Sequence, residues 1–475
     1  MEYEAVIGME VHVQLNCKSK LFCGCSTDFH APPNTNVCPV CLGMPGAMPV
    51  LNRAMVTKSV AVGLALDCQI SRWSKMDRKN YFYPDQSKNY QISQYDLPVN
   101  HGGHLDIQVN GQTKRIGITR AHMEEDTARN THALGGGQSG VDFNRCGVPL
   151  LEIVTEPDIN SADEAHAYLT ELKQILQYLD VSDCNMEEGA LRAEANISVR
   201  PKGTAAFGTK TEVKNVASFS GTYKAIEYEI ARQIQVLNDG GTVVQETRGW
   251  DDDRGVTFSQ RAKESAHDYR YFPEPDLVPV VVDEAWEQEI RASLPELPAA
   301  RRARLLDTFG LSDYDAGVLT ASRAMADYYE AVAVIAAPKK AANWIMGDLQ
   351  ALITEDKGDI GAIRVSPENL GAMINLIENG TISGKIAKEV LVELYRTGKS
   401  PDVVIQEKGL VQISDQGALE AAVAEVIAAN PAQVAEFRAG KEKVLGFFVG
   451  QIMKATGGKA NPGMVNEILR EKLSN

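Results

Sequence analysis

The sequence predicts an α+β fold, in which an N-terminal antiparallel β-sheet with flanking helices is followed by all-α regions. Three observations lead to this prediction. Strand-like alternation of apolar and polar residues recurs through roughly the first 290 residues. Two segments within this part have helical spacing instead. From Leu294 onward the chain is rich in Ala, Leu and Glu at helical periodicity, which predicts helices only.

The first expected element is a strand over residues 6–15, VIGMEVHVQL. Side chains alternate between the two faces of a strand, so one face is apolar and the other carries Glu10, His12 and Gln14. An ordinary sheet with one face in water would produce the same alternation. This strand alone therefore leaves open whether its polar face forms a site.

Four cysteines follow as Cys-X-Cys and Cys-X2-Cys, with twelve residues between the two pairs. Two close pairs of thiolates on a loop match tetrahedral zinc, and a site with four protein ligands is closed and structural. The alternative is a set of unrelated buried thiols. The expected zinc ligands, on a loop over residues 23–41, are Cys23, Cys25, Cys38 and Cys41.

Polar faces like that of the first strand recur at residues 150–156, 191–200 and 209–215, and residues 120–127 add a histidine and three acidic residues. If these segments belong to one antiparallel sheet, its polar face gathers carboxylates, two histidines and several Lys and Arg. The residues concerned are His122, Glu124, Glu125, Asp126, Glu152, Glu156, Arg192, Glu194, Asn196, Ser198, Arg200, Lys210, Glu212 and Lys214.

Such a face contains the parts needed for phosphoryl transfer. Clustered carboxylates repel one another unless a cation lies among them, and Mg²⁺ prefers oxygen ligands. Interleaved Lys and Arg suit the phosphates of a nucleotide. Histidine is a less common Mg²⁺ ligand, so His12 is a candidate either for the metal or for orienting a water or a carboxylate.

The two expected helices begin near Ser161, which has Glu164 three residues later as in a capping box, and near Thr222. The second helix ends at Leu237, before two glycines. No Walker A loop is present. The nearest string, residues 203–210, lies between two strand patterns and is predicted to be a hairpin loop.

Changes in composition predict three domains, with boundaries at residues 1–293, 294–405 and 406–475. The net charge of −15 means that the surface as a whole repels nucleic acid. Residues 438–472 are an exception, because this segment contains seven Lys and Arg but only three Glu and is therefore basic. This segment is a candidate RNA contact, although a solvated helical face would look the same.

The composition, 44% hydrophobic and 23% charged, is that of an ordinary soluble globular protein. The N-terminus lacks a secretory signal pattern, and no apolar run approaches the length of a membrane span. We therefore expect a cytoplasmic protein without a membrane contact. In that compartment the eight cysteines indicate thiols or metal ligands rather than disulfides.

Two strings, residues 78–93 and 268–276, combine Lys and Arg with Tyr and Phe. Such mixtures can stack on bases or cover a nucleotide, but well-packed surface loops have the same composition. No Gly-X-Ser-X-Gly elbow or Ser-Gly-rich amidase segment is present. If the chemistry uses ammonia, another chain is expected to produce it.

Several long motifs resemble the B subunit of the tRNA-dependent amidotransferases, the GatB family. They include IGMEVHVQL, ITRAHMEEDTA, DFNRCGVPLLEIVTEPD, MEEGALRAEANISVRP, GTKTEVKN and DYRYFPEPDLVPV. The resemblance extends through NWIMGDL and TISGKIAKEV to the C-terminal GFFVGQIMKATGGKANPGMVNEIL, which is similar to the YqeY-like tail of that family. It therefore covers essentially the whole chain.

The resemblance implies a cradle domain with a kinase-like site, a helical domain and a tail that binds tRNA. It implies that ATP and Mg²⁺ are used to phosphorylate the side-chain carboxylate of Glu-tRNA(Gln) or Asp-tRNA(Asn). Ammonia, released from glutamine by a separate amidase subunit, then replaces the phosphate, and a small third subunit joins the other two in a heterotrimer. The implied activity is that of a ligase forming a C–N bond.

Matching the motifs implies Glu10, His12, Glu125 and Glu152 for the Mg²⁺ region, with Glu124 and Asp126 as weaker candidates. It implies Lys79, Arg192, Lys210 and Lys214 for phosphate or carboxylate contacts, with Glu194 and Asn215 beside the nucleotide. The expected catalytic set is Glu10, His12, Lys79, Glu125, Glu152, Arg192 and Lys214. Zinc cysteines occur in only some members of the family, so the zinc prediction rests on spacing.

Two alternatives remain open at this point. One is a stand-alone Mg²⁺- and ATP-dependent ligase that joins a carboxylate to an amine. The other is a zinc-containing RNA-binding scaffold without catalysis. The basic C-terminal segment favours the amidotransferase over the stand-alone ligase.

Overall fold

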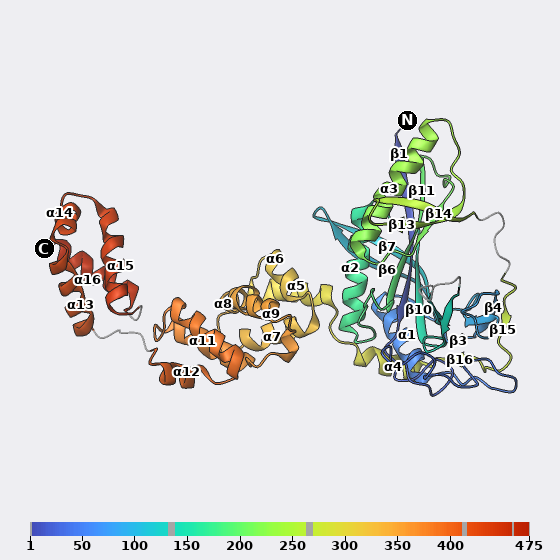
Figure 1. Ribbon diagram of the computed structural model, residues 1–475, viewed down its shortest axis with the longest axis horizontal. Helices are drawn as coiled ribbons and strands as arrows, with labels where there is room; N and C mark the ends of the chain where they lie inside the picture. The colour runs from blue at the N-terminus through green and yellow to red at the C-terminus, as the bar shows by residue number, and fades with distance from the viewer. Residues whose placement is uncertain (1, 132–137, 263–268, 411–415, 458–459, 475) are drawn as a thin grey trace. The chain divides into compact units, whose positions relative to one another are not determined.

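The computed structural model describes residues 2–131, 138–262, 269–410, 416–457 and 460–474 (Figure 1). The chain separates into two compact units, Met1–Leu297 and Pro298–Asn475. All of the described strands lie in the first unit, and the described regular elements of the second unit are helices. The predicted α+β fold, a sheet followed by helices, is confirmed. The finer division into three domains, with boundaries at 293 and 405, stays a prediction.

A nine-stranded sheet forms the centre of the first unit within the described residues. Its middle strand, β1, pairs antiparallel with β10 on one side and β11 on the other. All the pairs are antiparallel except that of β12 with β13. In spatial order the strands are β14 (Val256–Ala262), β13 (Glu246–Asp251), β12 (Thr211–Lys214), β11 (Leu191–Pro201), β1 (Tyr3–Gln14), β10 (Pro149–Thr155), β7 (Gln112–Glu125), β6 (Asn100–Val109) and β2 (Gln69–Ile70).

The apolar face of this sheet carries the hydrophobic core. Met9, Val11 and Val13 of β1 are buried there, as the alternation predicted. Helices α1 (Arg53–Ala65), α2 (Ala162–Tyr178) and α3 (Phe219–Asn238) pack on the sheet, and α4 (Glu284–Ser293) contacts α1 (Figure 1). The polar side chains of β1 therefore lie on the opposite face of the sheet.

The two predicted helices correspond to α2 and α3. The Ser161 hydroxyl accepts a hydrogen bond from the backbone N–H of Glu164 at 3.2 Å, so it caps α2 as expected. Helix α3 begins at Phe219, a few residues before the predicted start. Helix α1 was not predicted, because its buried residues surround most of its circumference and give no clear helical stripe.

Short strands lie beside the main sheet. The two strings that combine Lys and Arg with Tyr and Phe, residues 78–93 and 268–276, contribute to a three-stranded sheet. Its strands are β15 (Phe272–Pro273), β4 (Asp77–Asn80) and β5 (Tyr90–Ser93). Residue 268 lies outside the described residues. The remaining pairs are β16 (Val280–Val281) with β3 (Trp73–Ser74) and β8 (Arg129–Thr131) with β9 (Gly140–Asp142). Residues 203–210 connect β11 to β12, which pair antiparallel, so the predicted hairpin loop is confirmed.

A buried carboxylate joins α3 to the strands on one side of the sheet. Glu229 is fully buried and accepts hydrogen bonds from Thr211 of β12 at 2.7 Å and Thr257 of β14 at 3.0 Å. Arg232 donates two further bonds to Glu229, at 2.6 and 2.9 Å, and Gln233 donates one at 3.0 Å. This network holds β12, whose last residue is Lys214, against α3.

The described residues of the second unit form two separate hydrophobic cores. The first is formed by α5 (Pro298–Phe309), α6 (Asp313–Leu319), α7 (Arg323–Ala333), α8 (Pro338–Trp344), a π-helical turn (Ile345–Leu349), α9 (Gln350–Glu355), a 3₁₀ turn (Ile360–Ala362), α10 (Pro367–Glu378), α11 (Gly384–Thr397) and α12 (Pro401–Lys408). The second is formed by α13 (Gln416–Ala429), α14 (Pro431–Arg438), a 3₁₀ turn (Glu442–Val444), α15 (Leu445–Ala455) and α16 (Pro462–Ser474).

The basic residues of the C-terminal segment are exposed wherever they are described: Arg438, Lys441, Lys443, Lys454, Arg470 and Lys472. Lys459 lies outside the described residues. Among the described helices, none combines the length and the apolar character that crossing a membrane requires.

Replacing Glu229 with Gln should destabilise the chain at pH 7 by about 3–5 kcal/mol, because the Arg232 guanidinium and the buried hydroxyls lose their anionic partner. Burial raises the pKa of Glu229, but hydrogen bonds from Arg232, Gln233 and Thr211 bring it below its ordinary value of 4.5. The ionised carboxylate of Glu229 therefore stabilises the fold fully above about pH 4.5, its ordinary pKa. This contribution is lost as the pH falls from there through the lower pKa that Glu229 has in the folded chain.

The measurement is chemical denaturation of the wild type and the variant at pH 7 and pH 4, where the difference should be smaller. Glu227→Gln, on an exposed position of the same helix, serves as the control and should change stability by less than about 0.5 kcal/mol. Equal stability of the Glu229→Gln variant and the wild type at pH 7 would contradict the account.

Candidate functional site

A row of polar side chains crosses the middle of the main sheet in register. His12 of β1 lies opposite Arg192 of β11 on one side and Glu152 of β10 on the other. Glu152 in turn lies opposite His122 of β7. Because residues paired across neighbouring strands point to the same face, four strands contribute to one group of side chains.

Three carboxylates surround the imidazole of His12. Its Nε2 atom lies 3.3 Å from Oε2 of Glu152, 3.6 Å from Oε1 of Glu124 and 3.8 Å from Oε1 of Glu10. Glu124 is only 2% exposed and Glu152 only 5%. The polar face is therefore enclosed at this point, which the alternative of a sheet face open to water does not account for.

His122 is a further member of this group. Its Nε2 atom lies 3.6 Å from Oε2 of Glu152 and 4.0 Å from Oε2 of Glu124. The Nδ1 atoms of both His12 and His122 are buried without a hydrogen-bond partner among the described residues. Each imidazole thus keeps one buried nitrogen atom without a hydrogen-bond partner, which is unusual for a buried polar group.

The carboxylates differ in their affinity for protons. Burial, together with the charges of Glu152 and Glu194, raises the pKa of Glu10 to about 7. Burial and Glu152 raise the pKa of Glu124 to about 7 as well. Burial opposes ionisation of Glu152 too, but His122 and His12 lower its pKa well below the ordinary value. At neutral pH, Glu152 is the fixed negative charge of the group.

The two histidines respond in opposite directions. Burial lowers the pKa of His12, but the hydrogen bond and charge of Glu152, with the charges of Glu124 and Glu194, raise it to about 9. Burial lowers the pKa of His122 to about 4, an effect that the charge of Glu152 only partly offsets. His12 is therefore a cation at neutral pH, and His122 is neutral.

Two lysines complete the charge balance. Nζ of Lys214 lies 2.5 Å from Oε2 of Glu194, which is the register partner of Glu10. Nζ of Lys79, on β4, lies 5.0 Å from the ring centre of Tyr269. Burial lowers the pKa of Lys79, but the carboxylates of Glu124 and Glu152 raise it above its ordinary value.

Arg192 is held by Asp126 at the margin of the group. Its two terminal nitrogens lie 3.1 and 3.2 Å from the two carboxylate oxygens of Asp126, which also accepts a hydrogen bond from Gln14 at 2.6 Å. Burial raises the pKa of Asp126, but Arg192 and Arg145 lower it to about 2. Asp126 thus positions Arg192 at the end of the polar row.

The structure does not bring Glu125 into this group. Neighbouring residues of a strand face opposite sides, so Glu125 points away from the face that carries Glu124. It pairs instead with Lys88, whose Nζ lies 2.7 Å from Oε1 of Glu125. Of the two adjacent glutamates, Glu124 is the one that lies beside His12.

Two further residues expected beside a nucleotide lie outside the enclosed group. Lys210 is exposed on the loop between β11 and β12. Asn215 is exposed just after β12, where its side-chain amide donates to Gln260 at 3.3 Å. Lys210 and Asn215 directly flank β12, the strand that carries Lys214, and both are exposed to solvent.

Two overlapping sets of side chains in the group have the spacing of a metal site. One is Glu10, His12 and Glu194, and the other is His12, Glu124 and Glu152. In each set the potential ligand atoms lie within 4.8 Å of one another. Carboxylates supply the oxygen atoms that hard divalent cations prefer, and the imidazole is the less usual ligand.

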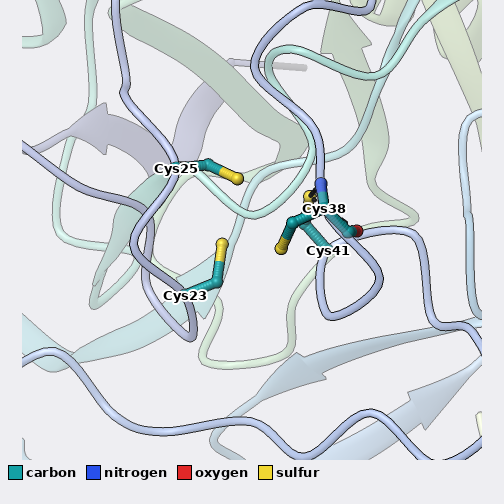
Figure 2. A group of neighbouring side chains, drawn as sticks. All are labelled: Cys23, Cys25, Cys38 and Cys41. Carbon is teal, nitrogen blue, oxygen red and sulfur yellow. Dashed lines mark hydrogen bonds between the residues drawn. The ribbon is translucent and has the colours of Figure 1, made fainter.

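The four cysteines of the predicted zinc loop meet in space, with their sulfur atoms turned toward a common centre (Figure 2). All four sulfur atoms lie within 4.8 Å of one another, and all the cysteines of the chain are free thiols. The backbone N–H of Cys38 donates to Sγ of Cys41 at 3.2 Å. We refer to Cys23, Cys25, Cys38 and Cys41 as the cysteine cluster.

A buried lysine accompanies the cysteine cluster. Lys20 is only 1% exposed, and its Nζ lies 3.6 Å from Sγ of Cys41. Hydrogen bonding by Cys23 and the charge of Lys20 lower the pKa of the Cys41 thiol to about 4. A thiolate and a buried ammonium therefore compensate each other here, which suits a metal site rather than four unrelated thiols.

Three residues of these sites were absent from the expected catalytic and metal-binding sets: His122, Lys20 and Lys88. Alternation had already placed His122 on the polar face, and it lies on the same side of β7 as Glu124. Lys20 and Lys88 lie in irregular segments, where no local pattern indicates which way a side chain points.

Replacing Glu152 with Gln should lower the pKa of His12 from about 9 toward or below its ordinary value of 6.5, because burial then acts with less opposition. Titration of the histidine Cε1–H signals by NMR, in the presence of a chelator, measures this change. Glu156→Gln, at an exposed position just beyond β10, is the control and should leave the pKa of His12 unchanged. A His12 pKa near 9 in the Glu152→Gln variant would refute the assigned cause.

Comparison with known families gives two matches. A family model described as the GatB/GatE catalytic domain matches residues 5–288, which include the sheet and the cysteine cluster. A second, described as the GatB domain, matches residues 327–473. Together these matches extend over most of the chain.

Full-length relatives carry the name of the B subunit of aspartyl/glutamyl-tRNA(Asn/Gln) amidotransferase. The protein of that name from Moorella thermoacetica is 59% identical over 476 residues, and the one from Geobacter sulfurreducens is 58% identical over 478 residues, with 100% of both chains covered in each case. The one from Carboxydothermus hydrogenoformans is 57% identical, with 100% of this chain and 99% of that protein covered. The chain therefore belongs to the family of aspartyl/glutamyl-tRNA(Asn/Gln) amidotransferase B subunits.

Proposed function

We propose that this chain performs the ATP-dependent activation step of a tRNA-dependent amidotransferase. The side-chain carboxylate of Glu-tRNA(Gln) or Asp-tRNA(Asn) attacks the γ-phosphorus of ATP, ADP leaves, and an acyl phosphate forms. Ammonia then attacks the carbonyl carbon and phosphate leaves, which yields Gln-tRNA(Gln) or Asn-tRNA(Asn). The observation that carries the proposal is the enclosed group of carboxylates and imidazoles on the main sheet of the matched catalytic domain, with Lys214 of that sheet and Lys79 of β4 beside it.

A divalent cation fits this group. Without one, Glu10 and Glu124 have pKa values of about 7, because burial and repulsion favour their protonated forms. The residues that would hold Mg²⁺ are Glu10, His12, Glu124 and Glu152. His12 would bind the cation as a neutral imidazole, after losing the proton that the surrounding carboxylates hold on it in the absence of metal. When bound, the cation would offset the negative charge of the transferred phosphoryl group.

The basic side chains at the same face suit a polyphosphate. Lys79 and Lys214 are held among carboxylates, and Arg192 is oriented by Asp126, so each presents its charge from a fixed position. We assign Lys79, Arg192 and Lys214 to the phosphates or the substrate carboxylate, and Glu194, Lys210 and Asn215 to the neighbouring nucleotide. Positioning of this kind accounts for most of the catalysis in phosphoryl transfer.

The enclosure of the group has a chemical purpose under this proposal. An acyl phosphate is a good electrophile and hydrolyses if water reaches it, so it must form in a site from which water is excluded. The low exposure of Glu124 and Glu152 meets this requirement at the floor of the site. Ammonia must then arrive without passing through solvent, which favours delivery from a partner.

Partners supply what this chain lacks. Under the proposal, a separate amidase subunit releases ammonia from glutamine, and a small third subunit joins it to this chain in a heterotrimer. The exposed basic residues of α15 and α16, with Arg438, Lys441 and Lys443, are proposed to contact the tRNA backbone. The cysteine cluster is proposed to hold a structural Zn²⁺ through its four sulfur atoms.

The proposal predicts amidated tRNA when the chain is mixed with misacylated tRNA, ATP, Mg²⁺ and ammonium chloride, even without the amidase. Acid-urea gels or chromatography of the released amino acid measure the product. Free ammonia replaces the amidase, because activation of the carboxylate is assigned to this chain alone. Absence of product, even with both partner proteins added, would overturn the proposal.

Glu124→Gln should reduce this activity by about 100-fold or more, because a proposed cation ligand loses its charge. Glu156→Gln, exposed near the same sheet, should retain activity within about twofold. Glu125→Gln is expected to lose activity through its partner Lys88 rather than through the cation. If the chain were a non-catalytic RNA-binding scaffold, it would cleave no ATP, and neither Glu124→Gln nor Glu125→Gln would have an effect.

Replacing Lys454 and Arg470 with Ala should weaken tRNA binding and reduce the slope of log affinity against log salt by about one per residue. Nucleotide binding, measured in the same samples, should not change. Lys339→Ala, an exposed position on α8, is the control. A stand-alone ligase for a small amino acid predicts activity without tRNA and no effect of the tail substitutions.

A further inference from the structure

The cysteine cluster lies directly against the segment that carries Lys88. The backbone carbonyl of Cys41 accepts a hydrogen bond from the Ser87 hydroxyl at 2.8 Å and one from the Cys146 thiol at 3.4 Å. These contacts join a cluster ligand to the residue that precedes Lys88 in the chain. The two donors, Ser87 and Cys146, lie 46 and 105 positions further along the sequence than Cys41.

Gly43 makes a second contact with the same segment. Its φ of +66° is in the left-handed region, and a Cβ at this position would lie 2.3 Å from Cγ and 3.3 Å from Cα of Lys88. A real Cβ cannot approach so closely, so either Lys88 or the loop would have to move. The side chain of Lys88 therefore lies along a surface formed by the backbone of the loop that follows Cys41.

Lys88 reaches Glu125 from this position. Its Nζ lies 2.7 Å from Oε1 and 2.9 Å from Oε2 of Glu125, and the two side chains are 9% and 4% exposed. Glu125 is also fixed from its other side, because the backbone N–H of Ile92 donates to its Oε1 at 2.9 Å. Such a pair is costly to break, because either partner left alone would be a buried uncompensated charge.

The ion pair and the cysteine cluster face one small cavity of about 90 Å³, whose lining includes Lys20, Cys23, Cys41, Gly43, Lys88 and Glu125. One wall of this cavity, which includes Cys23 and Cys41, comes from residues 15–52, a segment without a helix or an extended strand. A loop of this kind is held by its side chains and any bound metal rather than by a backbone ladder.

We propose that the metal-loaded cysteine cluster is a positioning element that holds Lys88 on Glu125. With a divalent metal ion bound, the four thiolates fix residues 38–43, and the Cys41 carbonyl and Gly43 in turn fix residues 87 and 88. Without the metal, four converging thiols no longer hold the loop, and Lys88 loses the surface that orients it. This coupling rests on the metal binding proposed above for the cysteine cluster, and it goes beyond the activation step because it requires neither ATP nor tRNA.

The test is amine footprinting of the full-length chain with an acetylating reagent and mass spectrometry, in the presence of Zn²⁺ or after chelation. Chelation, or Cys25→Ser, should raise the acetylation rate of Lys88 by about tenfold, while Lys214 on the polar face of the sheet should not change. Adding Zn²⁺ back to the chelated wild type should restore protection. Zinc content and far-UV circular dichroism are measured in the same samples.

A matched pair of glycine variants separates the contact from the metal. Gly43→Ala should expose Lys88 while the chain keeps its zinc, because the added methyl meets Lys88 and not the cysteines. Gly46→Ala, also at positive φ but with no atom within 4 Å of the added Cβ, should leave Lys88 protected. Protection of Lys88 in folded, zinc-free protein, or in Gly43→Ala, would overturn the proposal, as would failure of the chain to bind Zn²⁺.

Discussion

The pairing register of β1 is the constraint on which the polar site depends. This strand is hydrogen-bonded on both sides, and its register places Arg192, His12, Glu152 and His122 in one row. Because side chains alternate along a strand, a slip of one residue would carry His12 to the apolar face and Val13 to the polar one. The buried core on the apolar face therefore excludes registers shifted by an odd number of residues, so the hydrophobic effect that stabilises the sheet also keeps the polar side chains on one face.

The same register creates an electrostatic conflict that the chain resolves only in part. It brings Glu10, Glu124, Glu152 and Glu194 close together in a region of low exposure. His12, Lys79 and Lys214 compensate part of this charge, yet Glu10 and Glu124 still bind protons up to about pH 7. A fold selected for stability alone would not gather these groups, since buried charges cost more to desolvate than apolar residues. The remaining charge is a reason to assign a cation and a phosphate-bearing substrate to this face.

Much of the sheet could be predicted from sequence, because alternation reports which face each side chain of a strand occupies. The strand at residues 6–15, the polar face of residues 191–200 and the hairpin before Thr211 all follow from it. The motif match favours Glu125 over Glu124 for the Mg²⁺ region. Alternation along β7 instead places Glu124 on the same face as His122, two residues away. Spacing also indicated the cysteine cluster. The positions of Lys20 and Lys88 could not be predicted, because they depend on contacts between irregular segments far apart in the chain.

Adjacent residues at the end of β7 belong to two different sites. Glu124 faces His12 on the polar side of the sheet, and Glu125 faces Lys88 and the cavity beside the cysteine cluster. The two side chains point to opposite faces because they are neighbours on a strand. Backbone hydrogen bonds to β10 hold both residues in register, with Glu124 opposite Leu150 and Glu125 opposite Pro149. The register of this one strand end therefore fixes the backbone of both glutamates, so that two adjacent residues supply one carboxylate to each of two sites.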